Sequence, residues 1–151
     1  MHTIEYWDLC KPTIGETYRS LIKTLCANSD TFYFITRKEL SYDQDVLKKF
    51  NPYIVNRYTT KEWANTMTMG PPATIYQMEA IEQTCLLLQQ CAHGLYDWVA
   101  PTLPEDLTFI KNDFPWFSST THEELAGFVI RSKYYRNIIL NVPGLHVLRT
   151  E

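Results

Sequence analysis

The stretch LPEDLTFIKNDFPWFSSTTHEELAGF, residues 103–128, decides the fold of this chain. Two runs rich in apolar residues, 107–110 and 116–117, flank the residues Lys-Asn-Asp-Phe-Pro, and Asn-Asp before a proline is typical of a turn between strands. The stretch therefore predicts a β-hairpin. A third strand is expected at residues 125–130, and the polar run THEE at residues 121–124 is expected at its start.

Apolar residues recur at helical spacing in four other segments. The strongest pattern covers residues 79–99, where apolar side chains fall on one side at steps of three and four, and it predicts a long central helix. Shorter helices are expected at residues 12–27, at about residues 44–51, where Pro52 forbids an undisturbed continuation, and at residues 132–140.

Two further strands complete the predicted order of elements. The β-branched and aromatic run at residues 31–36 predicts a buried strand, and residues 145–148 predict a last strand after a Pro-Gly turn. Residues 56–78 have little period and predict an irregular connection with a short extended piece at 73–78. The order indicates a single α+β domain over residues 1–151, with helices packed on one face of a mostly antiparallel sheet.

Composition favours a globular protein and excludes some partners. Of 151 residues, 45% are hydrophobic, and the ten Tyr and four Trp indicate an aromatic surface as well as a core. The net charge is −3 and the 14 Lys and Arg are spread along the chain without forming a basic stripe, so nucleic acid is not expected as a partner. No apolar run reaches the ~20 residues of a membrane span, and no signal segment stands at the start, which predicts a cytoplasmic protein without a membrane partner.

Five residues in and near the hairpin are candidates for a binding site. His122 stands beside carboxylates, which can orient an imidazole for acid–base chemistry, and on a strand it would share a face with Glu124. Glu105 and Asp106 supply a second pair of carboxylates, and Trp116 could be a platform for a planar ligand or a partner side chain. The structural alternatives are a histidine bonded to a loop backbone, a solvated turn and a core tryptophan.

Metal and cofactor chemistry find no support in the sequence. The histidines at positions 2, 93, 122 and 146 form no pair with metal-ligand spacing, and the cysteines at 10, 26, 85 and 91 match neither a redox pair nor a zinc set. No glycine-rich phosphate loop is present, and no nucleophile elbow surrounds Ser118 or Ser119. We expect no metal, no cofactor and four reduced thiols.

Several short motifs resemble those of a protein family. The residues LPEDL at 103–107, PWF at 115–117 and THE at 121–123, with WANT at 63–66 and Tyr76, resemble a pattern in a family of short bacterial and phage proteins, some of which are labelled stage III sporulation protein AH-like. The resemblance covers most of the chain. It implies a shared fold rather than an activity.

Two functions from different classes are compatible with these patterns. The first is a small soluble interaction protein, such as an inhibitor, an immunity-type protein or a regulatory partner, because acidic charge and many Tyr and Trp suit protein binding. The alternative is a hydrolase or small-ligand-binding enzyme that uses His122 with nearby carboxylates, which requires these groups to converge in one cavity.

Overall fold

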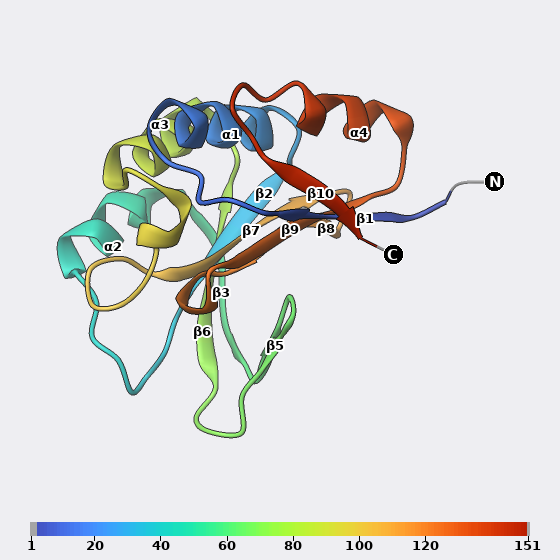
Figure 1. Cartoon of the computed structure of the whole chain (residues 1–151). Helices are drawn as coiled ribbons and strands as arrows, with labels where there is room; N and C mark the ends of the chain where they lie inside the picture. The colour runs from blue at the N-terminus through green and yellow to red at the C-terminus, as the bar shows by residue number, and fades with distance from the viewer. Residues whose placement is uncertain (1–2, 151) are drawn as a thin grey trace.

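One eight-stranded antiparallel sheet runs through the molecule in this computed structural model, which describes residues 3–150 (Figure 1). His2, one of the histidines considered as a metal ligand, lies outside that range. The strand order is β10-β1-β9-β8-β7-β2-β6-β3. The strands of this sheet are β1 (Glu5–Leu9), β2 (Thr31–Thr36), β3 (Ile54–Thr60), β6 (Ala73–Glu79), β7 (Glu105–Lys111), β8 (Phe114–Thr120), β9 (Leu125–Ile130) and β10 (Val147–Thr150).

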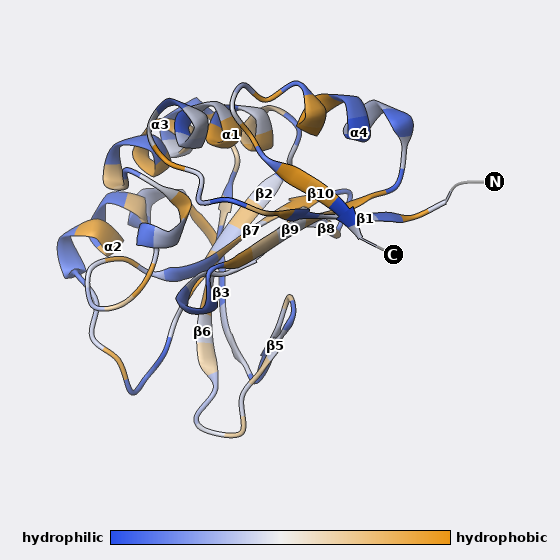
Figure 2. Cartoon of the chain, in the orientation of Figure 1, coloured by the Kyte–Doolittle hydropathy of each residue, from blue (hydrophilic) through white to orange (hydrophobic). Residues whose placement is uncertain are grey.

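The helices cover one face of the sheet, which we call the helix-covered face (Figure 1). They are α1 (Gly15–Ala27), α2 (Gln44–Phe50), α3 (Glu82–Cys91) and α4 (Lys133–Leu140), with short 3-10 turns η1 (Asn51–Tyr53), η2 (Leu95–Asp97) and η3 (Thr121–Glu123). Figure 2 shows that α1, α2 and α4 mix hydrophobic and hydrophilic residues, as helices with one buried side do. The predicted α+β class, helices on one face of an antiparallel sheet, is confirmed.

The alternation of side chains along β2 divides the core between the two faces of the sheet. Phe32 and Phe34 point toward the helices, where Phe34 packs edge-on against Phe50 with ring centroids 5.1 Å apart. Tyr33 and Ile35 point to the opposite, helix-free face. There the small hairpin of β4 (Glu62–Trp63) and β5 (Thr66–Met67) folds back, and Trp63 packs over Tyr33 and Ile35.

The predicted hairpin in residues 103–128 is present as β7 and β8. Asn112 and Asp113 form its turn with φ of 51° and 61°, the left-handed conformation that Asn and Asp tolerate better than other residues with a side chain. The third predicted strand is β9, with the predicted bounds. Residues 121–123 are a 3-10 turn rather than the start of that strand.

The long helix expected at residues 79–99 is wrong in length, because α3 ends at Cys91. The backbone becomes extended at Ala92, and the amide of Leu95 donates to the Thr13 carbonyl at 3.0 Å. Gly94 allows this approach, since a Cβ there would lie 3.0 Å from the Thr13 carbonyl oxygen and 2.8 Å from a side-chain carbon of Ile14. Contact with the start of α1 therefore overrides the helical periodicity of the segment.

Two further expectations needed correction, and one strand was missed. Within residues 56–78 the extended piece predicted at 73–78 is confirmed as β6, but the part predicted as irregular contains most of β3 and the β4–β5 hairpin. β3 is an edge strand with mostly exposed residues, so it lacks the apolar alternation of a half-buried strand. Strand β1 was not predicted, and the last strand is β10, two residues beyond the expected position.

Candidate functional site

Asp106 is the centre of a buried network on the helix-free side of the molecule. It lies in a β-bulge of β7 with φ of 59°, and it is fully buried. Its carboxylate accepts the indole N–H of Trp63 at 2.9 Å and the backbone N–H of Thr121 at 2.9 Å. One carboxylate thus fastens both the β4–β5 hairpin and η3 to the sheet.

Glu105 belongs to the same network but faces different partners. Its carboxylate accepts the Tyr42 hydroxyl at 2.7 Å and lies 3.7 Å from Nε of Arg37. The guanidinium of Arg37 sits over the Trp63 ring, 5.2 Å from its centroid. Burial, followed by the hydrogen bond to Glu105, raises the pKa of Tyr42 above its usual value. Glu105 therefore connects the loop before α2 with the covered half of the helix-free face.

His122 and Glu124 lie on η3 and on the residue that follows it, and both side chains are exposed. Nε2 of His122 is 3.8 Å from a carboxylate oxygen of Glu123. His122 and Glu124 were expected to share one face of a strand. This expectation does not apply, because residues 121–123 form a 3-10 turn and the backbone of Glu124 is left-handed. Within the described residues, the carboxylate that pairs with His122 is thus that of its direct neighbour in the chain.

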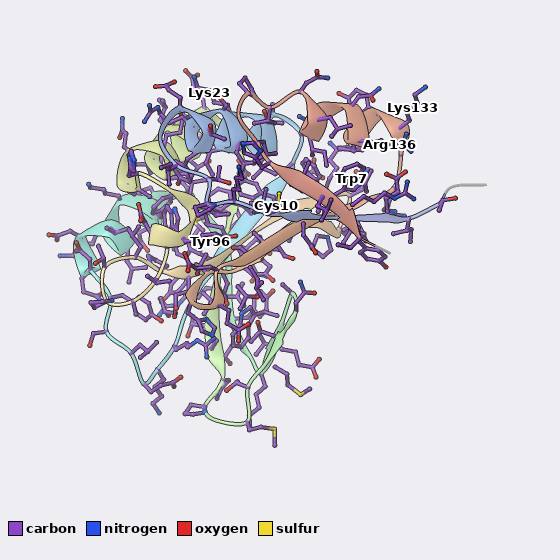
Figure 3. The ribbon with its side chains drawn as sticks, viewed as in Figure 1. Trp7, Cys10, Lys23, Tyr96, Lys133 and Arg136 are labelled. Carbon is purple, nitrogen blue, oxygen red and sulfur yellow. The ribbon has the colours of Figure 1, made fainter. Side chains whose placement is uncertain are left out.

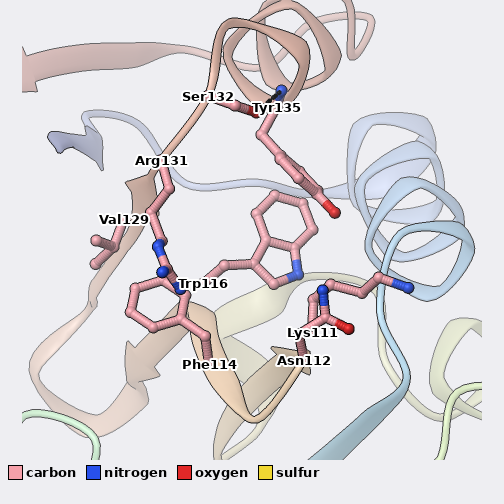
Figure 4. Close-up of a pocket in the computed structure, with 8 residues that line it drawn as sticks. All are labelled: Lys111, Asn112, Phe114, Trp116, Val129, Arg131, Ser132 and Tyr135. Atoms are coloured by element: carbon pink, nitrogen blue, oxygen red, sulfur yellow. Dashed lines mark hydrogen bonds between the residues drawn. The ribbon is translucent and has the colours of Figure 1, made fainter. Parts of the chain in front are cut away.

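Trp116 lies apart from these four residues, on the helix-covered face. Its ring packs against Phe128 and against Tyr135 of α4, with centroids 5.8 and 5.1 Å apart, and its N–H donates to the Ser29 hydroxyl at 2.9 Å. It is almost fully buried but lines a hollow between the β7–β8 turn and α4 (Figure 4). The structure therefore divides the five candidate residues between two places.

A groove opens on the helix-free face beside the Asp106 network. It lies between the β4–β5 hairpin and the strands β8, β9 and β1, and its volume is about 440 Å³. The amide of Asn65 on the hairpin donates to the Ser118 hydroxyl on the groove floor at 3.2 Å. The side chains that the argument below uses are Tyr6, Asp8, Asn65, Ser118, Glu123 and Leu125.

Gly127 shapes the floor of this groove. It lies opposite Asp8 on β1 and opposite Ser118 on β8. A Cβ at Gly127 would come within 2.7 Å of the Asp8 carboxylate and 2.8 Å of the Trp7 carbonyl oxygen. The missing side chain therefore leaves room for the Asp8 carboxylate over Gly127.

Large apolar side chains stand exposed around the groove. Tyr6, Leu125 and Leu148 are 51%, 59% and 62% exposed. Leu148 of β10 pairs with Asp8, and cross-strand partners share a face, so Leu148 extends the surface formed by Tyr6 and Asp8. We call the exposed side chains of Tyr6, Leu125 and Leu148, with the groove between them, the open sheet face.

The electrostatic character of the open sheet face is acidic. Asp8 and Glu123 line the groove, no Lys or Arg lines it, and Asp8 forms no ion pair with any residue in the range 3–150. Burial and then the charges of Glu124 and Asp8 raise the pKa of the half-buried Tyr96 above its usual value. The groove can therefore receive a cationic group.

Comparisons with protein-family models, with curated proteins and with solved structures find no match. The family resemblance thus stays a prediction. Of the residues in that pattern, Trp63 and Thr121 both donate to Asp106, whereas Trp116 lies on the other face of the sheet. Within residues 3–150 no group of three His, Cys, Asp or Glu is arranged to hold a metal, and no helix is long and apolar enough to cross a membrane.

Sequence reasoning missed the side chains that β1 contributes to the groove. Residues 4–9 read Ile-Glu-Tyr-Trp-Asp-Leu, and in the structure Glu5, Trp7 and Leu9 point toward the helices while Tyr6 and Asp8 point away. Aromatic enrichment in this short run was an available strand signal. Figure 3 shows Trp7 beneath Arg136 of α4, on the helix-covered side of this strand.

Proposed function

We propose that this chain is a protein-interaction domain that binds its partner on the open sheet face. The observation that carries the proposal is the exposure of Tyr6, Leu125 and Leu148 around one groove. The other half of the helix-free face is covered by Trp63, so the domain shields one half of this surface and leaves the other uncovered. Exposed apolar side chains gathered at a concave surface and rimmed by polar groups are typical of a protein-binding site.

Charge indicates which part of a partner fits the groove. The Asp8 carboxylate is unpaired within the described residues, and Glu123 lies on the neighbouring wall. A Lys or Arg side chain could pair with both, with its aliphatic stem on Leu125. We therefore propose a partner protein that presents a basic side chain within an apolar contact.

The proposal is tested with two matched double variants. Leu125→Gln with Leu148→Gln alters the open sheet face, and Leu86→Gln with Leu140→Gln alters exposed leucines on α3 and α4. Each tagged protein is incubated with lysate of the native host, and retained proteins are quantified by mass spectrometry. We expect a partner that wild type and the helix variant retain and that the sheet variant loses.

A second measurement examines the charge on the purified partner. Asp8→Asn should weaken binding and reduce its dependence on salt, because an ion pair at an interface contributes both attraction and steering. Equal retention of every protein by the two leucine double variants would place the binding surface elsewhere. An unchanged salt dependence for Asp8→Asn would remove the basic side chain from the proposal.

A further inference from the structure

A second hollow lies around Trp116, and we call it the Trp116 hollow (Figure 4). It opens between the β7–β8 turn, the end of β9 and the start of α4, and its volume is about 300 Å³. Among lining residues it shares only Val129 with the groove on the open sheet face. Its volume is at the lower end of the range for small-molecule sites in proteins, which is roughly 300–1,000 Å³.

Aromatic rings form the walls of the hollow and are held in fixed positions. Trp116 is wedged between Phe128 and Tyr135, and its N–H is fixed by the Ser29 hydroxyl. Phe114 stands at the other side of the opening (Figure 4). Because these contacts already hold the Trp116 ring in place, a flat ligand can pack on it with little loss of side-chain entropy.

Positive charge gathers at the same hollow. The guanidinium of Arg131 lies 4.3 Å from the centroid of the Phe114 ring and forms no ion pair with any residue in the described part of the chain. Lys111 also lines the hollow, and its ammonium is already paired with Asp30 at 3.1 Å. No Asp or Glu lines the hollow. Arg131 is thus the cation that remains available to a ligand.

The start of α4 adds to this charge. Ser132 is the N-cap residue, and its hydroxyl accepts the backbone N–H of Tyr135 at 3.4 Å. The first turn of a helix carries unpaired N–H groups and a partial positive charge, which stabilise an anion nearby. Arg131 directly precedes this cap, and both Arg131 and Ser132 line the hollow (Figure 4).

We propose that the Trp116 hollow binds a small organic anion built on a planar ring, such as an arene carboxylate or an aryl phosphate. The ring lies against Trp116 and Tyr135, and the anionic group pairs with the Arg131 guanidinium. The side chain of Phe114 orients that guanidinium through a cation–π contact. This site does not depend on protein binding at the open sheet face.

The test uses benzoate and phenyl phosphate as probes, with benzamide as the uncharged analogue of benzoate. Binding is followed in ¹H–¹⁵N NMR spectra of the whole chain, where the Trp116 indole N–H reports on the hollow. We expect saturable shifts with both anions and at least about tenfold weaker binding of benzamide, because a charge-assisted pair with Arg131 is lost.

Two variants distinguish specific binding in the hollow from nonspecific attraction of the anion to a basic surface. Arg131→Gln should weaken benzoate binding at least about tenfold, whereas Lys133→Gln, which removes an exposed neighbouring charge outside the lining, should leave it within about twofold. Both positions are exposed, so both variants should fold. Absence of saturable shifts at millimolar probe, equal binding of benzamide, or equal losses in the two variants would each overturn the proposal.

Discussion

The indole N–H of Trp63 and the buried carboxylate of Asp106 form a hydrogen bond of 2.9 Å between residues 43 positions apart in the chain. The same carboxylate accepts the Thr121 amide, so the hairpin and the 3-10 turn that flank the groove have one common anchor. The geometry of the open sheet face therefore depends on a residue that no ligand in the groove would touch.

A double-mutant cycle tests this anchor. Asp106→Asn keeps the shape of the side chain and the tolerance for a left-handed backbone, but it replaces one of the two acceptor oxygens with an NH2 donor. It should therefore lower the free energy of unfolding by about 1–3 kcal/mol. Trp63→Phe removes the other partner and should cost a similar amount. Because they break the same bond, the double variant should lose less than the sum, by about 0.5–3 kcal/mol in urea unfolding. Strict additivity would contradict the shared bond.

Two leucines of α3, at positions 86 and 88, provide a matched test of the core. Leu88 is fully buried and Leu86 is 47% exposed, so truncation to alanine should cost about 2–5 kcal/mol at Leu88 and under about 0.5 kcal/mol at Leu86. Both variants keep a residue that favours helix, which separates packing from propensity. Similar midpoints of urea unfolding for the two variants would show that this side of α3 is not packed on the sheet.

The Glu5 carboxylate should make the stability of the folded protein depend on pH. Hydrogen bonds from Arg136 and then from Trp7 hold the pKa of Glu5 below its usual 4.5, so the folded protein binds this proton less tightly than the unfolded chain does. The stabilisation from this carboxylate is present above the usual pKa and is lost as the pH falls through the lowered value.

Glu5→Gln therefore should melt below wild type at about pH 6, and this difference should close as the pH falls toward about 3. Thermal unfolding followed by circular dichroism measures the difference. Glu39→Gln, which changes an exposed loop carboxylate, serves as the control and should track wild type throughout. A gap that stayed constant with pH would mean that Glu5 acts only through packing.

The thiol of Cys85 should be unusually reactive for a half-buried cysteine. The neighbouring Cys26 thiol lowers the pKa of Cys85 to about 7, and Gln89 donates a hydrogen bond to the Cys85 sulfur at 3.2 Å. Alkylation of Cys85 by iodoacetamide, measured by peptide mass spectrometry, should reach half its maximal rate near that pH. In Cys26→Ala the half-maximum should move up toward about 8.5. An unchanged pH profile in Cys26→Ala would show that Cys26 does not control the reactivity of Cys85.

The elements that local chemistry defines could be predicted from the sequence. Asn112 and Asp113 favour a left-handed turn on their own, and the aromatic and β-branched residues Phe128, Val129 and Ile130 of β9 favour a strand. The end of α3 could not be predicted in this way. It depends on Gly94 meeting Thr13, a contact between residues far apart in the chain.

The candidate site shows the same division. Glu105 and Asp106 stood out as carboxylates, but their partners Tyr42 and Trp63 come from other elements, and pairing at that separation leaves no local signal. No sequence motif pointed to Asp8. Its place in the groove follows from the register of β1 with β9, which a single sequence does not encode in any short window.

The position of β1 also has a consequence for protein synthesis. This strand lies between β9 and β10, and Arg136 binds Glu5 across 131 residues of chain. A ribosome therefore releases the first strand long before either of its neighbours exists, and β1 must wait without partners until the last part of the domain has emerged. The groove, to which β1 supplies Tyr6 and Asp8, can form only after nearly the whole domain has been translated.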